Sequence, residues 1–455
     1  MSAETVELRI DAIAAGGDGV GREADGRVVF VPLTAPGERV RAEVVTAKKS
    51  WARARLVDLL DPAEARRPAP CPVFGACGGC RLQHLPEARQ ATAKRAIVTA
   101  ALRRIGGIDV DVPEPIRVGE PFGYRNRVTL TVRRSGSGAE GEAVAGFFGL
   151  HEPDRVVDCP TCLLAEKPVR EAWRALAPFD VLPGGAEIRV TIRASSEGQI
   201  ALLVEGGDEA GDRDAVVERV PGLESYWWID EAGVRIQLAG RAAFIEEWRG
   251  VRFDLDPTVF LQVNREVAAA MDDWLDERLH ASAGRRIDGI GRLSAESLRG
   301  VRVADMYAGV GSRAIRWARA GATVATCEVD EAACAASAAA ARKAGARIAV
   351  HAGRVEENAD LLEADVVVVN PPRAGLGEGV RRALAGGPAG HVAYVSCDPA
   401  TLARDLAAVS SAYEVLEVQP FDVFPQTAHV ETIAWLQRRE AIARPDPEAV
   451  EEEAA

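Results

Sequence analysis

Long hydrophobic runs are missing from this 455-residue sequence, and none approaches the roughly 20 residues that a membrane-spanning helix needs. The first residues, Met1 to Leu8, have no basic flank and no apolar core, so we expect no secretory signal peptide. Internal repeats are also lacking. With 47% hydrophobic and 27% charged residues, the composition is that of a globular protein of about two to four domains, which we expect in the cytoplasm.

Net positive charge is lacking over the whole chain, because 68 Asp and Glu outnumber 55 Lys and Arg, and the formal net charge of −13 argues against a nucleic-acid partner. The charge is not uniform, because residues 81–134 hold eleven Lys and Arg against five Asp and Glu. A basic stretch in an acidic protein is compatible with local contact to phosphate groups. A solvated surface of mixed charge is the alternative interpretation of this stretch.

Short strands separated by Gly-rich turns are indicated in residues 4–60. Two of these turns contain Gly16-Gly17-Asp18-Gly19 and Pro36-Gly37. Five short strands in so few residues favour a small barrel of the OB type, a fold that commonly binds nucleic acid. An SH3-like barrel without a role in RNA binding is the alternative.

The pattern changes twice along the rest of the chain. Residues 120–255 indicate mostly strands and one helix near Lys167–Ala177. From Pro257 onward strands alternate with helices, which predicts a doubly wound parallel sheet. We therefore divide the chain into a barrel (1–60), a mainly β central domain (61–255), an α/β domain (256–440) and an acidic tail (441–455) that we expect to be disordered. Residues 281–300, rich in Gly and Arg, receive no assignment.

Cys397 follows an apolar run and precedes Asp398, Pro399 and a helical pattern. Asp398 can cap this helix and Pro399 suits its first turn, so the thiol is expected where a strand ends and a helix begins. Only a few per cent of a free thiol with a pKa of roughly 8.5 is ionised at neutral pH, and a helix N-terminus favours the anion. This position suits a nucleophile, and a buried structural Cys is the alternative.

A predicted strand enters a Gly-rich turn that contains Asp305, Gly309 and Gly311, and a helix follows. Glycine lets the backbone approach a ligand at the carboxyl end of a strand. The third Gly of the dinucleotide fingerprint is absent, since position 314 is Ala. The next strand ends in Glu328, which suits a ribose with both hydroxyls free. The pattern favours S-adenosylmethionine over a nicotinamide cofactor.

Asn370-Pro371-Pro372-Arg373 ends a further strand at the same edge of the predicted sheet. In amino-methyltransferases an aromatic residue follows the two prolines and grips a planar nitrogen. Arg373 occupies that position here, and this disfavours methylation of an amino group.

The eight Cys residues are spread unevenly, which in a reducing compartment suggests metal binding or catalysis rather than disulfides. Cys71, Cys77 and Cys80 lie within ten residues of one another. Cys159 and Cys162 offer a fourth ligand. By spacing alone, a zinc site with four Cys is an alternative to an iron–sulfur cluster.

Taken together, these features make the chain resemble the S-adenosylmethionine-dependent RNA 5-methyluridine methyltransferases that carry a TRAM domain and an iron–sulfur cluster. The resemblance extends from about residue 4 to residue 438. Each motif is weak alone, and the ordered set is specific. The motifs are Cys71-x5-Cys77-x2-Cys80, Tyr124-Arg125-Asn126-Arg127, Phe260-Leu261-Gln262-Val263-Asn264, Asp305–Gly311, Asn370-Pro371-Pro372-Arg373, Ser396-Cys397-Asp398-Pro399 and Phe424–Glu431.

The resemblance implies a Rossmann-like methyltransferase domain together with an OB-like TRAM barrel and a mainly β central domain. It implies that Cys397 adds to carbon 6 of uracil, so that carbon 5 can take a methyl group, and that Glu431 then removes the carbon 5 proton. The implied S-adenosylmethionine contacts are Gln262, Tyr307, Ser312, Glu328 and Asn370. The implied [4Fe-4S] ligands are Cys71, Cys77, Cys80 and Cys162, with Cys159 as the alternative to the last.

The implied substrate is a uridine extruded from folded RNA, whose phosphates the barrel and residues 81–134 would hold. The family acts on 23S rRNA or on position 54 of tRNA, and a TRAM domain together with the cluster favours rRNA. A non-catalytic iron–sulfur RNA-binding protein or ribosome assembly factor is one rival interpretation. A small-molecule or cytosine methyltransferase is another. Neither a membrane nor an obligate protein partner is implied.

Three positions depart from the family pattern. Asn370 stands where many members have Asp, Asp398 stands where many have Asn, and Ala308 replaces a common Cys. A carboxylate at Asp398 is expected to oppose ionisation of the neighbouring thiol. Because the nucleophile and the base are both present, we expect these departures to alter affinity rather than activity.

Overall fold

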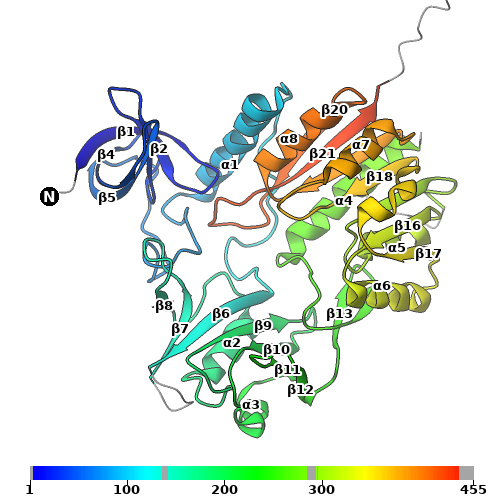
Figure 1. Ribbon diagram of the computed structural model, residues 1–455, viewed down its shortest axis with the longest axis horizontal. Helices are drawn as coiled ribbons and strands as arrows, with labels where there is room; N and C mark the ends of the chain where they lie inside the picture. The colour runs from blue at the N-terminus through cyan, green and yellow to red at the C-terminus, as the bar shows by residue number, and fades with distance from the viewer. Residues whose placement is uncertain (1–3, 136–141, 284–293, 295, 440–455) are drawn as a thin grey trace, which may run out of the picture.

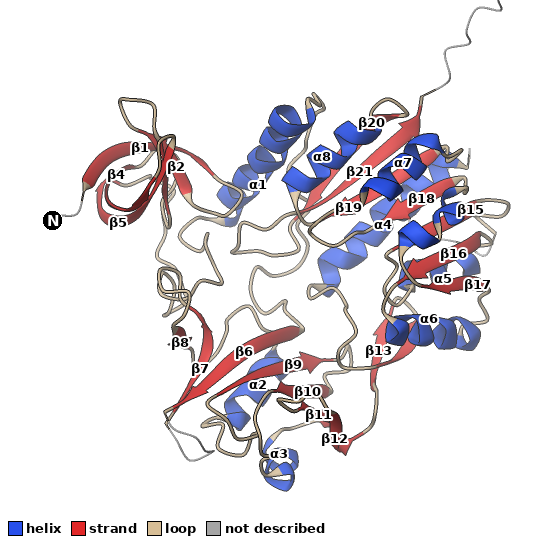
Figure 2. Cartoon of the chain, in the orientation of Figure 1, coloured by secondary structure: helices blue, strands red, loops and turns tan. Residues whose placement is uncertain are grey.

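The computed structural model describes residues 4–135, 142–283, 294 and 296–439. Three sheet-bearing parts surround a central space crossed by loops (Figures 1 and 2). The acidic tail at 441–455 and most of the unassigned segment at 281–300 lie outside the described residues. Within the described ranges, no helix is both long and apolar enough to cross a membrane.

The N-terminal part is a closed barrel in which the strand order is β1-β2-β3-β5-β4. The strands are β1 (Thr5–Ile13), β2 (Gly19–Arg22), β3 (Val28–Val31), β4 (Arg39–Ala47) and β5 (Trp51–Asp61). Alternate residues such as Ile10, Val29 and Val40 fill its interior because successive side chains of a strand point to opposite faces. The predicted five-stranded barrel is confirmed.

Helix α1 (Glu87–Ala101) lies between the barrel and the C-terminal sheet and continues into the short η1 (Leu102–Gly106) (Figure 1). The sequence patterns did not predict this helix. Two of its buried positions, Gln90 and Lys94, are polar and completely enclosed, so its buried face does not appear as an apolar stripe.

The central part is a seven-stranded sheet in the order β12-β11-β10-β9-β6-β7-β8. Its elements are β6 (Arg127–Arg134), β7 (Ala143–Phe148), β8 (Val156–Asp158), α2 (Lys167–Leu176), β9 (Glu187–Ala194), β10 (Ile200–Glu205), α3 (Arg213–Arg219), β11 (Leu223–Ile229) and β12 (Arg235–Gly240). Trp173 of α2 is 1% exposed and packs against the strands. The mainly β character and the helix near 167–177 are as predicted.

A hairpin of β13 (Phe244–Trp248) and β14 (Val251–Leu255) leads into α4 (Arg265–Ser282). Asn264 caps α4, because its side-chain oxygen accepts a hydrogen bond from the Val267 N–H at 3.3 Å.

The C-terminal part is a doubly wound sheet in the order β17-β16-β15-β18-β19-β21-β20, in which β21 alone among the described strands runs in the opposite direction to the others. Its strands are β15 (Arg302–Met306), β16 (Thr323–Glu328), β17 (Ile348–Ala352), β18 (Val366–Val369), β19 (His391–Ser396), β20 (Tyr413–Phe421) and β21 (Glu431–Arg438). Its helices are α5 (Ser312–Arg319), α6 (Glu331–Lys343), α7 (Glu378–Gly386) and α8 (Pro399–Val409), with short η2 (Val355–Glu357) and η3 (Ala359–Leu362).

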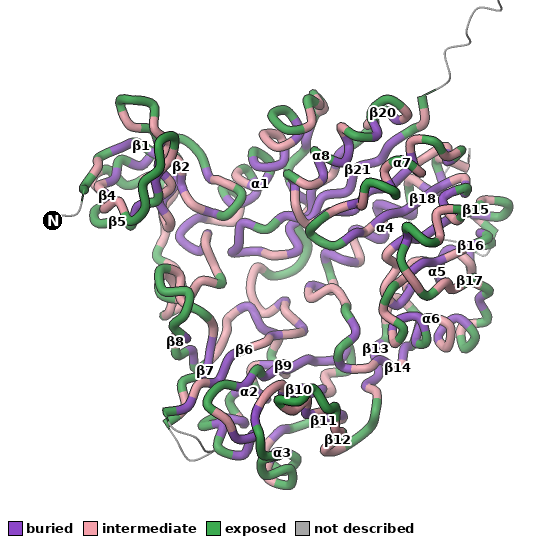
Figure 3. The backbone as a smooth tube through the Cα atoms, in the orientation of Figure 1, coloured by how far each residue is buried: buried purple, intermediate pink, exposed green. Residues whose placement is uncertain are grey.

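Strand β18 explains how this sheet is covered on both faces. Its four valines are all buried, and alternate valines join two different clusters of apolar side chains. Helices α7 and α8 contribute to one cluster, and α4 and α5 contribute to the other. A continuous apolar strand is what burial on both faces of a parallel sheet requires. The inner strands β15, β18, β19 and β21 are correspondingly buried along most of their length, whereas the edge strands β17 and β20 are not (Figure 3). The predicted doubly wound domain is confirmed.

Candidate active site

The carboxyl ends of β15, β16, β18 and β19 open into a cleft of about 770 Å³. Ligands bind at this edge of α/β sheets. Six residues singled out from the sequence line it, and a seventh, Ser312, lines an adjoining recess that shares part of the same wall. The six are Gln262, Tyr307, Glu328, Asn370, Cys397 and Glu431. Residues separated by up to 169 positions in the chain therefore meet in one space.

One end of the cleft is formed by the turn after β15. Tyr307, Gly309 and Gly311 all have positive φ, at 58°, 57° and 65°. A Cβ on Gly311 would lie 2.4 Å from the Ser337 hydroxyl, so only glycine fits there. Glu328 at the end of β16 accepts a hydrogen bond from the Gly309 N–H at 2.8 Å, which holds the turn against the neighbouring strand.

Asp305 lies near the end of β15 and begins the segment Asp305–Gly311 that the sequence analysis assigned to the cofactor. Its carboxylate is fully buried, and neither oxygen has a hydrogen-bond partner among the described residues. Burial raises the pKa of Asp305 to about 6, and the positive charge of Arg313 opposes this rise. Buried polar atoms are usually hydrogen-bonded, so an unsatisfied carboxylate at the base of a turn marks a place that can accept hydrogen bonds.

The opposite end of the cleft contains Cys397, at the junction of β19 and α8. Asp398 caps α8 by accepting the Thr401 N–H at 2.8 Å, and Pro399 occupies the first turn, as the sequence predicted. Burial raises the pKa of the Cys397 thiol, the Glu431 charge adds to this rise, and Arg373 opposes it. The helix N-terminus alone predicted the opposite direction, but burial and the nearby carboxylate outweigh it.

The carboxylate that opposes thiol ionisation is therefore Glu431, whereas the sequence pointed to Asp398. The Asp398 carboxylate is turned toward the N-terminus of α8 and is engaged there. Glu431 begins β21 and is 5% exposed. Burial raises its pKa to about 7, and the positive charges of Arg373 and Arg313 oppose the rise. A carboxyl group with this pKa can take up and release a proton near neutral pH.

Arg373 is a candidate functional residue that was not predicted from the sequence to lie beside Cys397 and Glu431. Arg373 lines the same cleft as Cys397 and Glu431, and its positive charge opposes the rise in pKa at both. The sequence contained a signal, because Arg373 follows the two prolines at the end of a strand. Taken alone, that signal argued only against methylation of an amino group.

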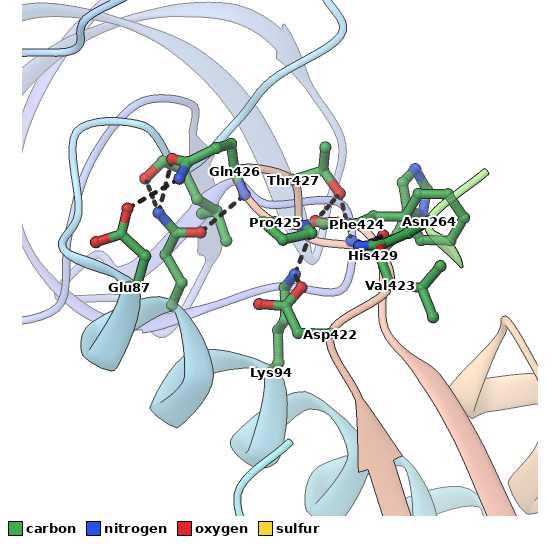
Figure 4. A network of polar contacts seen from close by, with 12 residues as sticks. Glu87, Lys94, Asn264, Asp422, Val423, Phe424, Pro425, Gln426, Thr427 and His429 are labelled. Atoms are coloured by element: carbon green, nitrogen blue, oxygen red, sulfur yellow. Dashed lines mark hydrogen bonds and ion pairs between the residues drawn. The ribbon is translucent and has the colours of Figure 1, made fainter. Parts of the chain in front are cut away.

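The loop from Asp422 to Val430, which we name the catalytic loop, joins β20 to β21 and carries Phe424 and His429 into the cleft. Helix α1 holds it from one side (Figure 4). The ammonium of Lys94 pairs with Asp422 at 2.5 Å and donates to the Phe424 carbonyl at 2.9 Å. The Gln426 N–H donates to the Gln90 side chain at 2.9 Å. Buried polar groups on α1 thus form an ion pair and hydrogen bonds with this loop.

The central domain holds the same loop from the other side. The Tyr124 hydroxyl donates to the Pro425 carbonyl at 3.0 Å, and the guanidinium of Arg125 lies 5.4 Å from the centre of the Phe424 ring. Asn126 holds a second segment of the cleft wall, because its side-chain amide donates to the Gln262 carbonyl at 3.0 Å. The three residues of the Tyr-Arg-Asn motif therefore contact two segments of the cleft wall, the catalytic loop and the segment at Gln262.

The Cys residues of the central part line a separate small cavity of about 130 Å³. They are Cys71, Cys77, Cys80, Cys159 and Cys162. Burial raises the pKa of several of these thiols, that of Cys80 to about 12, so free thiolates are unfavourable there. Among the described residues, no group of three or more His, Cys, Asp or Glu is arranged to hold a metal ion.

Comparisons with known proteins agree with this geometry. Residues 1–57 match the TRAM domain, and residues 352–439 match the tRNA (Uracil-5-)-methyltransferase family. An uncharacterized RNA methyltransferase of Thermosynechococcus vestitus is 34% identical over 463 residues, covering 95% of this chain and 98% of the relative. One from Gloeobacter violaceus is 32% identical and covers 96% and 97%. The chain belongs to a family of RNA methyltransferases.

A solved structure supports the fold of this RNA methyltransferase. The tRNA (uracil-54, C5)-methyltransferase of Pyrococcus abyssi, in complex with S-adenosyl-L-homocysteine, aligns with a TM-score of 0.72 and 23% identity. The alignment covers 95% of this chain and 100% of that one. This RNA methyltransferase is S-adenosylmethionine-dependent, and its cleft has the two ends that methyl transfer between a cofactor and a nucleobase requires.

Proposed function

We propose that this enzyme methylates carbon 5 of a uridine in RNA through a covalent bond between Cys397 and carbon 6 of the base. The observation that carries the proposal is the convergence of Cys397, Arg373 and Glu431 at one end of a cleft whose other end is the Gly-rich turn. A non-catalytic RNA-binding protein has no need of a buried carboxyl group and a thiol that face the same space.

Each side chain at the catalytic end has a step that suits its environment. The Cys397 thiolate adds to carbon 6, and the electron pair of the ring double bond moves toward the carbonyl oxygen at carbon 4. Arg373 favours the thiolate form of Cys397, against the effects of burial and of Glu431. S-adenosylmethionine supplies the methyl group that carbon 5 takes.

Glu431 completes the reaction in this scheme. Its carboxylate removes the proton from carbon 5, the double bond between carbons 5 and 6 re-forms, and the bond from carbon 6 to sulfur breaks. A pKa of about 7 leaves a large share of Glu431 ionised at neutral pH. The carboxylate can therefore act as a base without a further activating group.

At the cofactor end, we propose that Gln262, Tyr307, Ser312, Glu328 and Asn370 contact S-adenosylmethionine. Glu328 supports this role because its Oε1 and Oε2 already accept backbone N–H groups, which orients the carboxylate toward the turn. A carboxylate held in this way can still accept a ribose hydroxyl with its remaining lone pairs. The unsatisfied carboxylate of Asp305 adds a second acceptor beneath the turn.

We further propose that Cys71, Cys77, Cys80 and Cys162 hold a [4Fe-4S] cluster. We take Cys162 rather than Cys159 as the fourth ligand, as the family resemblance implies. The Cys159 thiol donates to the Thr161 carbonyl at 3.1 Å, which requires its proton. A zinc site with four Cys is the alternative, because structural zinc sites use similar loops.

Iron analysis tests the cluster and its ligands. Protein purified without oxygen is expected to be brown and to contain about four irons per chain. Cys162→Ser should lose iron, while Cys159→Ser should keep it. Stoichiometric zinc without iron would replace the cluster by a zinc site.

For the RNA target we favour 23S rRNA, with uridine 54 of tRNA as the alternative. The TRAM barrel and the cavity lined by Cys support the first, as the sequence resemblance implied. The likeness to the tRNA (uracil-54, C5)-methyltransferase of Pyrococcus abyssi supports the second. Mass spectrometry of nucleosides from purified 23S rRNA and tRNA of a deletion strain decides between them. The cytoplasmic location and the domain limits stay predictions.

The covalent step has its own direct test. RNA that contains 5-fluorouridine should trap the wild-type enzyme, because fluorine at carbon 5 cannot leave as a proton. The expected result is a band of lower mobility on a denaturing gel that contains both protein and RNA. If such a band never forms while uridine RNA is methylated, the covalent mechanism is wrong.

A further inference from the structure

Three parts of the chain contact one another at one place, which we name the joint: the barrel, the Cys-rich segment (residues 71–85) and the catalytic loop. The N–H groups of Arg81 and Leu82, immediately after Cys80, donate to the Gln426 carbonyl at 3.2 Å and 3.0 Å. The Arg81 guanidinium pairs with Asp18 in the turn between β1 and β2 at 3.1 Å. In Figure 1 this turn reaches from the barrel toward the loop that precedes β21.

A small apolar core closes the joint. It contains Ile13 and Ala35 of the barrel part, Leu82 and Leu85 of the Cys-rich segment, Ile97 of α1, and Ala428 of the catalytic loop. All six side chains are less than a tenth exposed. Four segments therefore share one core, and none of them can shift without disturbing the others.

Gly17 of the barrel turn is packed closely against Arg81 and against Ala428 of the catalytic loop. It is buried and has a φ of 89°. A Cβ at this position would lie 2.6 Å from the Arg81 Cβ and 3.1 Å from the Ala428 Cβ. The barrel turn is thus seated directly against the loop, with no space for even a methyl group.

The position of Ala428 connects this contact to the chemistry. Ala428 directly precedes His429 and lies three residues before Glu431, and both of these line the cleft. Glu431 is held in place by the backbone at the start of β21, where Glu431 pairs with Phe421. A displacement of Ala428 is therefore carried along a short, tightly packed segment to the carboxylate.

We propose that the barrel is a positioning element of the active site, and that Gly17 is the residue through which its β1–β2 turn sets the position of Glu431. The barrel then has a role in proton removal from carbon 5, in addition to any contact with RNA. This proposal rests on the function proposed above for Glu431.

The test compares Gly17→Ala with Gly26→Ala. Both glycines are in the barrel and both have a φ of 89°, so both substitutions strain the backbone in the same way. A Cβ on Gly26 meets nothing within 4 Å, whereas one on Gly17 meets Arg81 and Ala428. Any difference between the two variants therefore reports the contact rather than the conformation of the backbone.

We expect Gly17→Ala to lower kcat by about tenfold while its RNA dissociation constant stays within about twofold of the wild type. Gly26→Ala should match the wild type in both. With ordinary uridine RNA, Gly17→Ala should also accumulate the methylated covalent adduct, because addition and methyl transfer precede the step that needs Glu431. Adding Ala428→Gly should restore part of the lost rate, since it removes one of the two close contacts.

Two results would overturn the proposal. One is weaker RNA binding by Gly17→Ala with an unchanged rate of adduct decay, which would make the barrel an RNA platform alone. The other is equal behaviour of the Gly17→Ala and Gly26→Ala variants.

Failure of the proposed function looks different, because the wild type would then not be trapped by 5-fluorouridine RNA. If Gly17→Ala does not fold, Asp18→Asn removes the ion pair with Arg81 and should lower kcat by about twofold to threefold without loss of RNA affinity.

Discussion

The two ends of the active-site cleft are built in different ways. The cofactor end is centred on the turn after β15 and the end of β16, which are joined by backbone hydrogen bonds to Glu328. Gln262 and Asn370 complete its wall, and Asn126 of the central domain donates to the Gln262 carbonyl. The catalytic end takes Arg373 from the segment after β18, Cys397 from the β19–α8 junction, and Glu431 from the start of β21. The catalytic loop before Glu431 contacts α1, the central domain and the barrel.

The two ends of the cleft therefore depend on different contacts. The turn after β15 and Glu328 are held by neighbours in the chain, so changes in α1 or the barrel should leave them intact. The catalytic end depends on contacts between residues hundreds of positions apart, such as Lys94 and Asp422, which are 328 residues apart. The following experiments test this independence, beginning with the largest expected effect.

The largest effect is expected at the catalytic residues themselves. Cys397→Ala should abolish both methylation and the covalent RNA adduct, because no other group supplies the nucleophile. Glu431→Gln should methylate once and then remain attached to RNA, since a neutral amide cannot take the carbon 5 proton. Denaturing gels with labelled RNA and labelled methyl groups distinguish the two.

Cys334→Ala is the matched control, because Cys334 is a buried thiol of the same domain that does not line the cleft. It should keep both methylation and trapping. If the Cys397→Ala variant still methylates RNA, the segment around Cys397 has a structural role and Cys397 is not the nucleophile.

The second effect concerns the buried ion pair beneath the catalytic loop. Lys94→Met leaves the Asp422 carboxylate buried without its partner, which should cost about 3 kcal/mol or more in the free energy of unfolding. The affinity for S-adenosylmethionine, measured by calorimetry on the folded protein, should stay unchanged. Activity should fall because the catalytic loop, which leads into Glu431, loses its support from α1.

Lys343→Met is the matched control, since Lys343 pairs with Asp254 on the exposed surface. Urea denaturation should detect a loss of less than about 1 kcal/mol for that variant. Loss of S-adenosylmethionine affinity in Lys94→Met would contradict the independence of the two ends.

The third effect is a dependence on pH at Glu431. Its pKa is raised from 4.5 to about 7 in the folded protein, so the folded state binds this proton more tightly than the unfolded state does. The resulting stabilisation is complete below about pH 4.5 and is lost as pH rises through about 7. At about 1.4 kcal/mol for each pH unit between the two values, the loss approaches about 3 kcal/mol.

The rate of proton removal should change in the opposite direction, because only the ionised carboxylate is a base. Decay of the methylated adduct should therefore accelerate as pH rises through about 7. Glu431→Gln should remove this part of the pH dependence of unfolding. An unchanged profile in that variant would assign the titration to another group.

The smallest effect is expected at the cofactor end. Glu328→Gln keeps the shape of the side chain but weakens its acceptance of a ribose hydroxyl, so S-adenosylmethionine should bind about 1–3 kcal/mol more weakly. RNA binding and trapping by 5-fluorouridine RNA should persist. Glu331→Gln, in the exposed first turn of α6, is the control and should leave the affinity unchanged. Tight binding of a nicotinamide dinucleotide would contradict the assignment.

Local patterns predicted the elements that are fixed by neighbouring residues. The strand β16 ends at Glu328 as expected, and Asp398 caps α8 as expected. These predictions succeed because capping and apolar periodicity are properties of residues close together in the chain. Strands β17 and β21 were not predicted as elements, although Glu431 at the start of β21 was identified from its motif.

Long-range contacts explain what could not be predicted. Helix α1 escaped detection because Gln90 and Lys94 are buried for their hydrogen bonds with the catalytic loop, a partner that no local pattern reveals. The pKa of Cys397 was expected to fall because of the helix N-terminus. The structure raises it, since Glu431 and burial depend on how the chain folds around the thiol.

By itself, the sequence determined the order of the parts, the barrel, the doubly wound sheet, and the residue types available for catalysis, because these follow from periodicity and from motifs a few residues long. Only the tertiary structure decided that Arg373 lines the same cleft as Cys397, that α1 supports the catalytic loop, and that Gly17 is seated against Ala428. Such contacts join residues distant in the chain, and their partners are selected by shape and buried charge when the parts pack together.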